Sequence, residues 1–397
     1  MKLLKDSIYN LVGNIAYALS QSLIIIILNK LGTPVDVGSF TYAMAIVIPF
    51  FILAQGGLRS IISIDAKENY NFNTYFYLRL ICCFIALFSV VLININNNYL
   101  SIIVLLAIFK LMDSIFDIYY GQYQRDGKFK NIYRSRLFRS IGNTFSFAAT
   151  YYFTKDLILS LTIYVLSSLI IYIISDFRKY KINYFDIKLS TLYKVFIISL
   201  PLAVSSFLIS LNTNIPRLLL ENKVGIIILG AFGSFIYLLN ICQIVVQSIC
   251  QVFSPRLARY YLDSNYAAFN KNSYLLITLI FLISAFFVLF AISLQDIIFY
   301  LLFNSSFNEY KKIYEYIIYI SPIIFCGVAL GNICTAQRLI KFQPYIFLLI
   351  TIINLTSAYF TISLYGIYGA ILSLVLVSLL TCILLTLYMK FAKRNKK

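Results

Sequence analysis

The sequence contains no histidine among its 397 residues, and only 12% of its residues are charged. Without histidine it has no Ser-His-Asp triad, no histidine general base and no histidine-ligated metal. Its seven cysteines lie in apolar stretches without a C-x-x-C pair, which predicts buried thiols and neither a disulfide framework nor a zinc site. It also lacks the G-x-x-x-x-G-K-[ST] phosphate loop, so the chain does not hydrolyse ATP. We therefore expect no catalytic residue, no metal and no cofactor.

Apolar residues dominate what is present. They make up 61% of the chain, aromatic residues make up 17%, and the mean hydropathy is +0.85. A soluble domain carries about 25% charged residues and is about half apolar, so the composition excludes an ordinary globular protein. The class that fits is an all-α integral membrane protein that crosses the bilayer many times.

Apolar runs between charged or turn-rich breaks predict about twelve spans. We expect them at residues 7–28, 37–57, 74–93, 99–120, 137–153, 157–175, 191–212, 225–252, 273–294, 313–334, 345–364 and 367–389. Duplicated transporters divide into two halves of six helices. We expect an N-terminal six-helix lobe at residues 1–180 and a C-terminal six-helix lobe at residues 181–397, around a central cavity.

The net charge of +18 predicts the topology. When alternate loops are counted from the N-terminus, 26 of the 33 Lys and Arg residues fall on one side and six on the other, while Lys110 lies inside a span. Positive loops remain in the cytoplasm, so both termini are expected there. The positive charge thus has a membrane explanation, and we expect no nucleic-acid partner. No loop is long enough to form a soluble catalytic domain.

The expected span at 99–120 carries Lys110, Asp113 and Asp117 within about 60° of one helical face. An ionisable group near the middle of a bilayer costs roughly 2.5 to 3.5 kcal/mol and usually faces a partner or a hydrated cavity. Two interpretations are open at this point. Lys110 and Asp113 form a structural ion pair, or these residues belong to a substrate or coupling-ion path.

Two other spans carry polar stripes. The stripe in the first span consists of Asn10, Asn14, Tyr17 and Gln21, and that in the span at 225–252 of Gly233, Tyr237, Asn240, Gln243, Gln247 and Gln251. Each stripe alone is also typical of hydrogen bonds between packed helices. Their comparable places in the two halves favour a hydrated cavity between the lobes.

Segments at the span junctions resemble the bacterial Wzx-type polysaccharide flippases of the multidrug/oligosaccharidyl-lipid/polysaccharide exporter superfamily, over nearly the whole chain. The segments are LNKLGTPVDVGSFTYAMAI (28–46), LRSIISIDAK (58–67), KLMDSIFDIYYGQYQRDGKFKNIYRS (110–135), NIPRLLLENKVGIIILGAF (214–232), SPRLARYY (254–261) and YGIYGA (365–370). Within 110–135, Asp117, Gly121, Gln124 and Arg125 follow in the family's order.

The resemblance implies a flippase that moves undecaprenyl-diphosphate-linked oligosaccharides across the inner membrane for O-antigen (lipopolysaccharide) or capsule synthesis. Cations would compensate the diphosphate; the candidates are Lys110, Arg139 and Arg217, although the two arginines could instead snorkel to the interface. Further substrate-binding candidates are Tyr17, Tyr237, Asn240 and Gln243. If transport is antiport, Asp113 and Asp117 are the candidate ion-coupling carboxylates.

Two other functions stay open. The first is a cation-coupled small-molecule or drug exporter of the same superfamily, and the second is a membrane polysaccharide polymerase or glycosyltransferase. The flippase interpretation predicts a transporter and not an enzyme. Its partners would be the lipid-linked oligosaccharide, the membrane lipid and a polysaccharide polymerase. We expect a monomer that spans the bacterial cytoplasmic membrane many times.

Overall fold

The computed structural model describes the chain apart from residues 1, 65–69, 176–188, 338, 340–341 and 395–397. The described residues form α-helices and one short 3-10 helix, and they contain no strand. In chain order the elements are α1 (Lys2–Leu31), α2 (Pro34–Gln55), α3 (Leu58–Ile64), α4 (Phe72–Ile93), α5 (Leu100–Arg125), α6 (Phe129–Thr154), α7 (Leu157–Ser175), α8 (Leu189–Lys223), α9 (Ile226–Leu262), α10 (Tyr266–Ser293), α11 (Gln295–Leu302), η1 (Ser305–Tyr310), α12 (Lys311–Ala336), α13 (Gln343–Tyr365) and α14 (Ile367–Arg394).

Each of the twelve expected spans corresponds to one long helix. Ten of these helices are long and apolar enough to cross a membrane. The other two, α5 and α6, have 26 residues each, which gives a length of about 39 Å at 1.5 Å per residue. Helices α5 and α6 match the other long helices in length, but their charged residues lower their mean hydropathy. The prediction of an all-α membrane protein that crosses the bilayer many times is confirmed.

The chain forms two compact units, residues 1–210 (unit 1) and residues 211–397 (unit 2). The change of unit falls within α8. The lobe boundary expected between residues 180 and 181 lies outside the described residues.

Unit 1 is organised around α5, which packs against α2, α3, α4 and α7. Helix α1 packs along α6, and α6 packs along α7. Most of the inward face of α5 consists of buried aromatic and aliphatic side chains, such as Phe109, Phe116 and Tyr119. The charged residues of α5 are therefore held within a packed helical environment and not on a free surface.

The turn between α1 and α2 explains the sequence of residues 28–46. Thr33 caps α2 in a capping box with Asp36, and Pro34 begins the helix where its missing N–H costs nothing. The Tyr151 hydroxyl of α6 donates a 2.9 Å hydrogen bond to Asp36. The same hydroxyl lies so close to Gly32 that a Cβ at position 32 would clash with the hydroxyl. The motif fixes the α1–α2 turn to the end of α6.

In unit 2, α12 packs against α9, α10 and α14, and α13 packs against α14. Its core contains Val246, Leu276 and Phe325, all fully buried. The proline in α8 has a specific partner on α13. Pro216 has no N–H, so the carbonyl of Asn212 loses its helical donor. The buried Asn354 side chain replaces that donor with a 2.9 Å hydrogen bond.

Candidate functional site

The first site in unit 1 surrounds Asp113 on α5. Arg139 of α6 donates a 2.7 Å hydrogen bond from Nη2 to Asp113 Oδ1. Lys110 lies one turn before Asp113, with its Nζ 3.6 Å from Oδ2. The ion pair expected from the sequence is therefore present, but arginine is the closer partner. Lys110 is close enough for electrostatic attraction and too far for a good hydrogen bond.

Arg139 itself is buried between aromatic rings. Its guanidinium carbon lies 3.9 Å from the ring centre of Phe116 and 5.2 Å from that of Tyr17 on α1. The residue is 1% exposed, so it does not extend to the membrane interface. The structure brings together four of the predicted residues: Tyr17, Lys110, Asp113 and Arg139. We call them the Asp113 cluster.

A second cluster surrounds Asp117, one turn further along α5. Arg59 of α3 lies 3.2 Å from Oδ1 and Arg79 of α4 lies 3.1 Å from Oδ2. We call these three residues the Asp117 cluster. Asp117 shares a helical face with Lys110, as predicted, but its bonded partners come from two other helices. Each carboxylate of α5 thus contacts two cations.

The order Asp117, Gly121, Gln124 along α5 explains how Arg59 is positioned. These residues follow at i, i+4 and i+7 and so share one face. A Cβ at Gly121 would lie 3.1 Å from the Arg59 Cα, so glycine permits α3 to approach α5 closely. Gln124 accepts a 3.2 Å hydrogen bond from Arg59 Nε. The motif builds a docking face for α3, with the carboxylate at one end.

Tyr120 and Arg136 lie beside the two clusters. The Tyr120 ring has Arg136 at 5.0 Å and Arg59 at 5.7 Å. Its hydroxyl is 2.9 Å from Ser135 Oγ and accepts a long, 3.5 Å hydrogen bond from Arg139. Arg136 is 7% exposed and makes no ion pair with a described residue. It is a buried cation whose guanidinium packs on the aromatic face of Tyr120.

Among the described side chains of this region, the charges do not balance. Two carboxylates, Asp113 and Asp117, face five cations. The cations are Arg59, Arg79, Lys110, Arg136 and Arg139, and with the two carboxylates they carry a net charge of +3. We call these seven residues the unit 1 charge cluster. A buried positive excess is costly unless an anion compensates it.

Several guanidinium donors of the cluster are also unsatisfied. Arg79 is 1% exposed, and its Nε and Nη1 have no hydrogen-bond partner among the described residues. The same holds for Arg136 Nη1 and Arg139 Nε. A buried donor without a partner costs about 1–3 kcal/mol, and more when it is charged. The excess charge and the unpartnered donors are features that an anion with several oxygens would compensate.

Among its described residues, unit 2 contains one buried cation of the same kind. Arg217 of α8 is 4% exposed, so it also does not snorkel. Its Nη1 donates a 3.2 Å hydrogen bond to Asn214 Oδ1, and the guanidinium lies 5.4 Å from the Tyr237 ring of α9. Arg217 Nε has no partner among the described residues. The predicted residues Arg217 and Tyr237 therefore lie in contact, and no described carboxylate forms an ion pair with Arg217.

The rest of the two polar stripes is less concentrated. In α9, Asn240 and Gln243 are half-buried and make no hydrogen bond with a described side chain. Gln247 accepts a 3.4 Å hydrogen bond from Asn332. In α1, Gln21 donates to the Tyr164 hydroxyl at 2.9 Å, which is a helix-to-helix contact. The side chain of Asn10 lies outside the described residues.

Sequence reasoning missed Arg79, Arg136 and Arg59 as site residues. Arg79 was counted with a cytoplasmic loop, although it is a lone charge at the start of the apolar run LRLICCF. Arg136 precedes Arg139 by three residues and shares its helical face. These two signals were available in the sequence. The pairing of Arg59 with Asp117 was not, because it depends on how α3 folds back onto α5.

No metal site accompanies these clusters in the described part of the chain: no three Cys, Asp or Glu side chains gather there to hold an ion. The seven cysteines are free thiols, of which Cys83, Cys250 and Cys334 are buried and the other four are half-buried. The chemistry of the region is that of arginine, lysine, carboxylate and tyrosine.

Comparison with known proteins places the fold. Two solved structures are similar over 99–100% of this chain and 96% of their own, at 14–15% identity. One is described as the inward-facing conformation of a multidrug resistance MATE family transporter of the MOP superfamily, with a TM-score of 0.67. The other is a MOP superfamily transporter from Pyrococcus furiosus, with a TM-score of 0.68. The chain has the fold of this transporter superfamily.

Sequence comparison gives the family. Residues 3–261 match the profile of the family described as polysaccharide biosynthesis protein. The capsular polysaccharide biosynthesis protein CapF of Staphylococcus aureus is 31% identical over 383 residues, which cover 94% of this chain and 95% of that protein. The resemblance to the Wzx-type flippases is thereby confirmed, and the chain belongs to the polysaccharide biosynthesis protein family.

Proposed function

We propose that the chain is a flippase that moves undecaprenyl-diphosphate-linked oligosaccharide units across the bacterial cytoplasmic membrane. Its family and its transporter fold support a role in polysaccharide export. The similarity to a capsular protein favours capsule over O-antigen as the product. The observation that carries the proposal is the unit 1 charge cluster, with its net charge of +3 and its free guanidinium donors.

A diphosphate matches the cluster in charge and in hydrogen-bonding geometry. It brings several acceptor oxygens and more than one negative charge. Guanidinium groups bind phosphate oxygens through paired N–H donors. Arg79 and Arg136 offer buried donors that no carboxylate uses. In a region of low dielectric, binding the diphosphate would satisfy these donors and remove the positive excess in one step.

The two carboxylates suggest how transport is coupled. Asp113 and Asp117 each hold two cations. When a diphosphate attracts those cations, the carboxylates lose part of their compensation and become able to bind a proton or another cation. The diphosphate of the substrate and the two carboxylates would then compete for the same arginines, so binding of the substrate is linked to binding of the coupling ion. This gives Asp113 and Asp117 the ion-coupling role.

Unit 2 carries a smaller candidate site of its own. Arg217 is a single buried cation over Tyr237, with one free donor. Asn240 and Gln243 follow on α9, one helical turn apart, and supply amide groups for sugar hydroxyls. Tyr17 and Tyr237 offer ring faces against which sugar rings pack. We assign these residues to the oligosaccharide part of the substrate and its diphosphate junction.

The remaining features of the proposal concern topology and partners. The excess of Lys and Arg on alternate loops supports a topology with both termini in the cytoplasm. The substrate would enter from the cytoplasmic leaflet and leave in the outer one, where a polysaccharide polymerase consumes it. The protein would work as a monomer, and transport would need no cofactor.

Arg136 gives the most direct test, because it makes no ion pair with a described residue. Arg136→Gln removes an uncompensated buried charge, so the protein should fold at least as stably as the parent. Export of lipid-linked oligosaccharide in a flippase-deficient capsule strain should nevertheless fall by tenfold or more. Arg134→Gln is the matched control, since Arg134 is an exposed arginine on the same helix.

Export is measured as surface polysaccharide at equal membrane abundance. Binding is measured as the rise in thermal stability that undecaprenyl diphosphate causes in the purified protein. Loss of both with Arg136→Gln, and neither with Arg134→Gln, supports the proposal. Parental export and binding in the Arg136 variant would overturn the role of the cluster. Efflux of cationic dyes without any effect on polysaccharide would point to the exporter alternative.

A further inference from the structure

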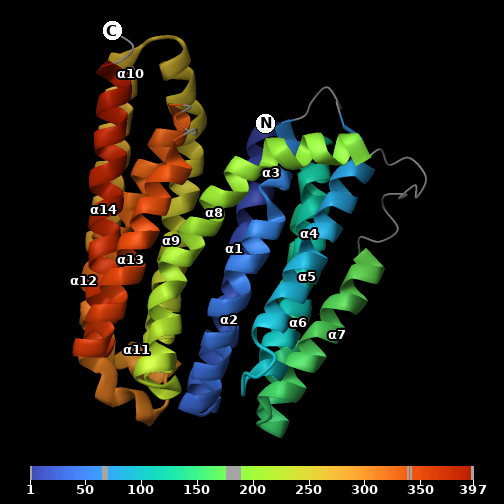
Figure 1. Ribbon diagram of the computed structural model, residues 1–397, viewed down its shortest axis with the longest axis vertical. Helices are drawn as coiled ribbons and strands as arrows, with labels where there is room; N and C mark the ends of the chain where they lie inside the picture. Colours follow the sequence, from blue (N-terminus) through green and yellow to red (C-terminus); the bar gives the residue numbers. More distant parts are fainter. Residues whose placement is uncertain (1, 65–69, 176–188, 338, 340–341, 395–397) are drawn as a thin grey trace. The chain divides into compact units, whose positions relative to one another are not determined.

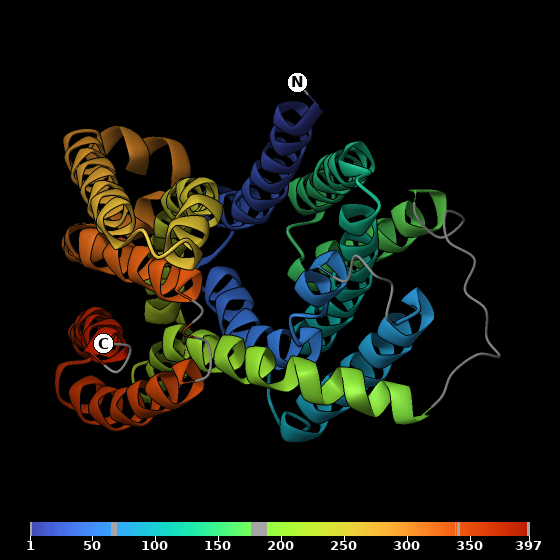
Figure 2. The ribbon, with the colours of Figure 1, turned by 90° about the horizontal axis from the view of Figure 1, so that it is seen from above.

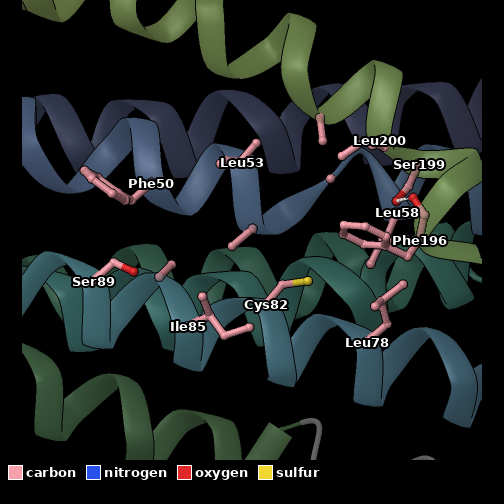
Figure 3. A pocket seen from close by; sticks show the side chains of 14 residues that line it. Phe50, Leu53, Leu58, Leu78, Cys82, Ile85, Ser89, Phe196, Ser199 and Leu200 are labelled. Atoms are coloured by element: carbon pink, nitrogen blue, oxygen red, sulfur yellow. Dashed lines mark hydrogen bonds between the residues drawn. The ribbon is translucent and has the colours of Figure 1, made fainter. Parts of the chain in front are cut away.

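Unit 1 contains an apolar groove between α2, α4 and the first turns of α8 (Figure 3). Its volume is about 340 Å³. The walls are formed by Phe50 and Leu53 of α2, Cys82 and Ile85 of α4, and Phe196 and Leu200 of α8. Figure 2 shows the beginning of α8 passing over α2 and α4. We call this cavity the α2–α4–α8 groove.

The groove extends along α4 and has no charged lining residue. On α4 its lining runs from Leu78 to Ser89, which spans about 16 Å at 1.5 Å per residue. Its lining includes no charged side chain, and the Ser199 hydroxyl is already bonded to the Phe196 carbonyl of its own helix at 2.9 Å. A volume near the lower end of small-molecule sites, about 300–1,000 Å³, suits a segment of one extended hydrocarbon chain.

One end of the groove adjoins the Asp117 cluster. Leu58 and Leu78 line that end, and the next residue of each helix is an arginine of the cluster. Arg59 and Arg79 converge on Asp117, and consecutive Cα atoms are only about 3.8 Å apart. The apolar groove thus ends beside two cations, of which Arg79 is buried and Arg59 is half-buried. This arrangement matches a lipid that joins an anionic headgroup to a hydrocarbon tail.

The break between α2 and α3 shapes the groove. Gly56 and Gly57 have φ values of +57° and +63°, which favour glycine. A Cβ at Gly57 would clash with the Leu202 side chain, so the missing side chain leaves room for α8. The same two glycines turn α3 toward α5, where Arg59 meets Asp117. A single break therefore sets both the groove wall and its cationic end.

We propose that the α2–α4–α8 groove holds the first isoprene units of the substrate's polyprenyl chain, with the diphosphate at Arg59 and Arg79. The inference rests on the proposed function and adds the location of the lipid tail. A polyprenyl diphosphate has one chain and two phosphates. A membrane phospholipid has two chains and one phosphate. One narrow groove beside two arginines fits the former.

Cys82 provides a reporter inside the groove. Its half-buried thiol should react with an apolar maleimide, at a rate that mass spectrometry measures in a Cys83→Ala background without the buried neighbour. Undecaprenyl diphosphate should slow the labelling of Cys82 at least fivefold. Inorganic diphosphate, which lacks a tail, and phosphatidylglycerol should not slow it. The half-buried Cys326 of unit 2 is the internal control and should keep its rate.

A matched pair of variants tests the same idea without labelling. Ile85 and Ile81 are both exposed on α4, but only Ile85 lines the groove. Ile85→Trp should weaken the binding of undecaprenyl diphosphate about tenfold and leave that of inorganic diphosphate unchanged. Ile81→Trp should change neither. Equal effects of the two substitutions would overturn the assignment of the tail to this groove.

The outcomes separate the two proposals. Protection of Cys82 by undecaprenyl diphosphate alone supports the groove. If undecaprenyl diphosphate stabilises the protein but leaves Cys82 equally reactive, the flippase proposal stands and the tail lies elsewhere. Equal protection by phosphatidylglycerol means that the groove takes ordinary lipid, which also overturns this inference. If neither diphosphate compound binds, the proposed function fails, and the groove assignment fails with it.

Discussion

Lys110 and Arg139 contact the same carboxylate, yet their removal should have very different consequences. Arg139 makes a 2.7 Å hydrogen bond to Asp113, whereas Lys110 Nζ is 3.6 Å away. Lys110→Leu leaves Asp113 with its better partner, so the free energy of unfolding should fall by about 1 kcal/mol or less, as for weak ion pairs. Arg139→Leu removes the short bond of a buried pair and should cost about 3–5 kcal/mol.

Export should not follow this order of stability. If Lys110 contributes its charge to the diphosphate, Lys110→Leu reduces export tenfold or more in a protein that is nearly as stable as the parent. Stability is measured by SDS-titrated unfolding of the purified protein in mixed micelles. Export is measured as surface polysaccharide in a flippase-deficient strain. Arg134→Leu, at an exposed position of α6, controls for the loss of any positive charge.

Two results would refute the reasoning. If Lys110→Leu destabilises the protein as much as Arg139→Leu, the geometry around Asp113 does not control the energetics. If Lys110→Leu is stable and exports like the parent, Lys110 is not a substrate contact. In that second case the net charge available to the anion falls from +3 to +2, and Arg79 and Arg136 would have to carry the binding.

Three further predictions concern other parts of the chain. Asn354→Leu leaves the Asn212 carbonyl unsatisfied and should lower the unfolding free energy by about 1–3 kcal/mol, measured by SDS titration; an unchanged value would mean that another donor takes over. Arg217→Lys keeps the charge but loses the planar guanidinium, so export should fall between that of the parent and that of Arg217→Ala. Reporter fusions after Lys130 and Lys155 should be cytoplasmic and periplasmic respectively; the reverse would invalidate the topology.

The long helices were predictable because their signal is local. An apolar run of about 20 residues predicts a membrane-spanning helix without information from the rest of the chain, and all twelve expected runs are helices. The short elements were not predictable. Helix α3 has seven residues, and it exists because two glycines at positive φ turn the chain. A search for apolar runs of about 20 residues does not detect such a break in the chain.

The candidate site was partly predictable for a related reason. A helical wheel shows that Lys110, Asp113 and Asp117 share a face of α5, and the structure agrees. It does not show which helix covers that face. Arg139 lies against one part of it, while Arg59 and Arg79 lie against the next. The partners come from chain positions 26–58 residues away, and no periodicity connects such residues.

The count of Lys and Arg residues by loops also hid two members of the unit 1 charge cluster. A count by loops treats every basic residue near a span end as a topology signal. Arg79 and Arg136 contribute to that count, yet both are buried in unit 1. A topology signal needs only charge on a surface, whereas these residues carry charge into a packed interior and leave donors free there. Retaining them costs stability in the empty protein. That cost is explained if an anion regularly occupies the cluster. We therefore expect substitutions of Arg136 to give variants that are more stable and less active.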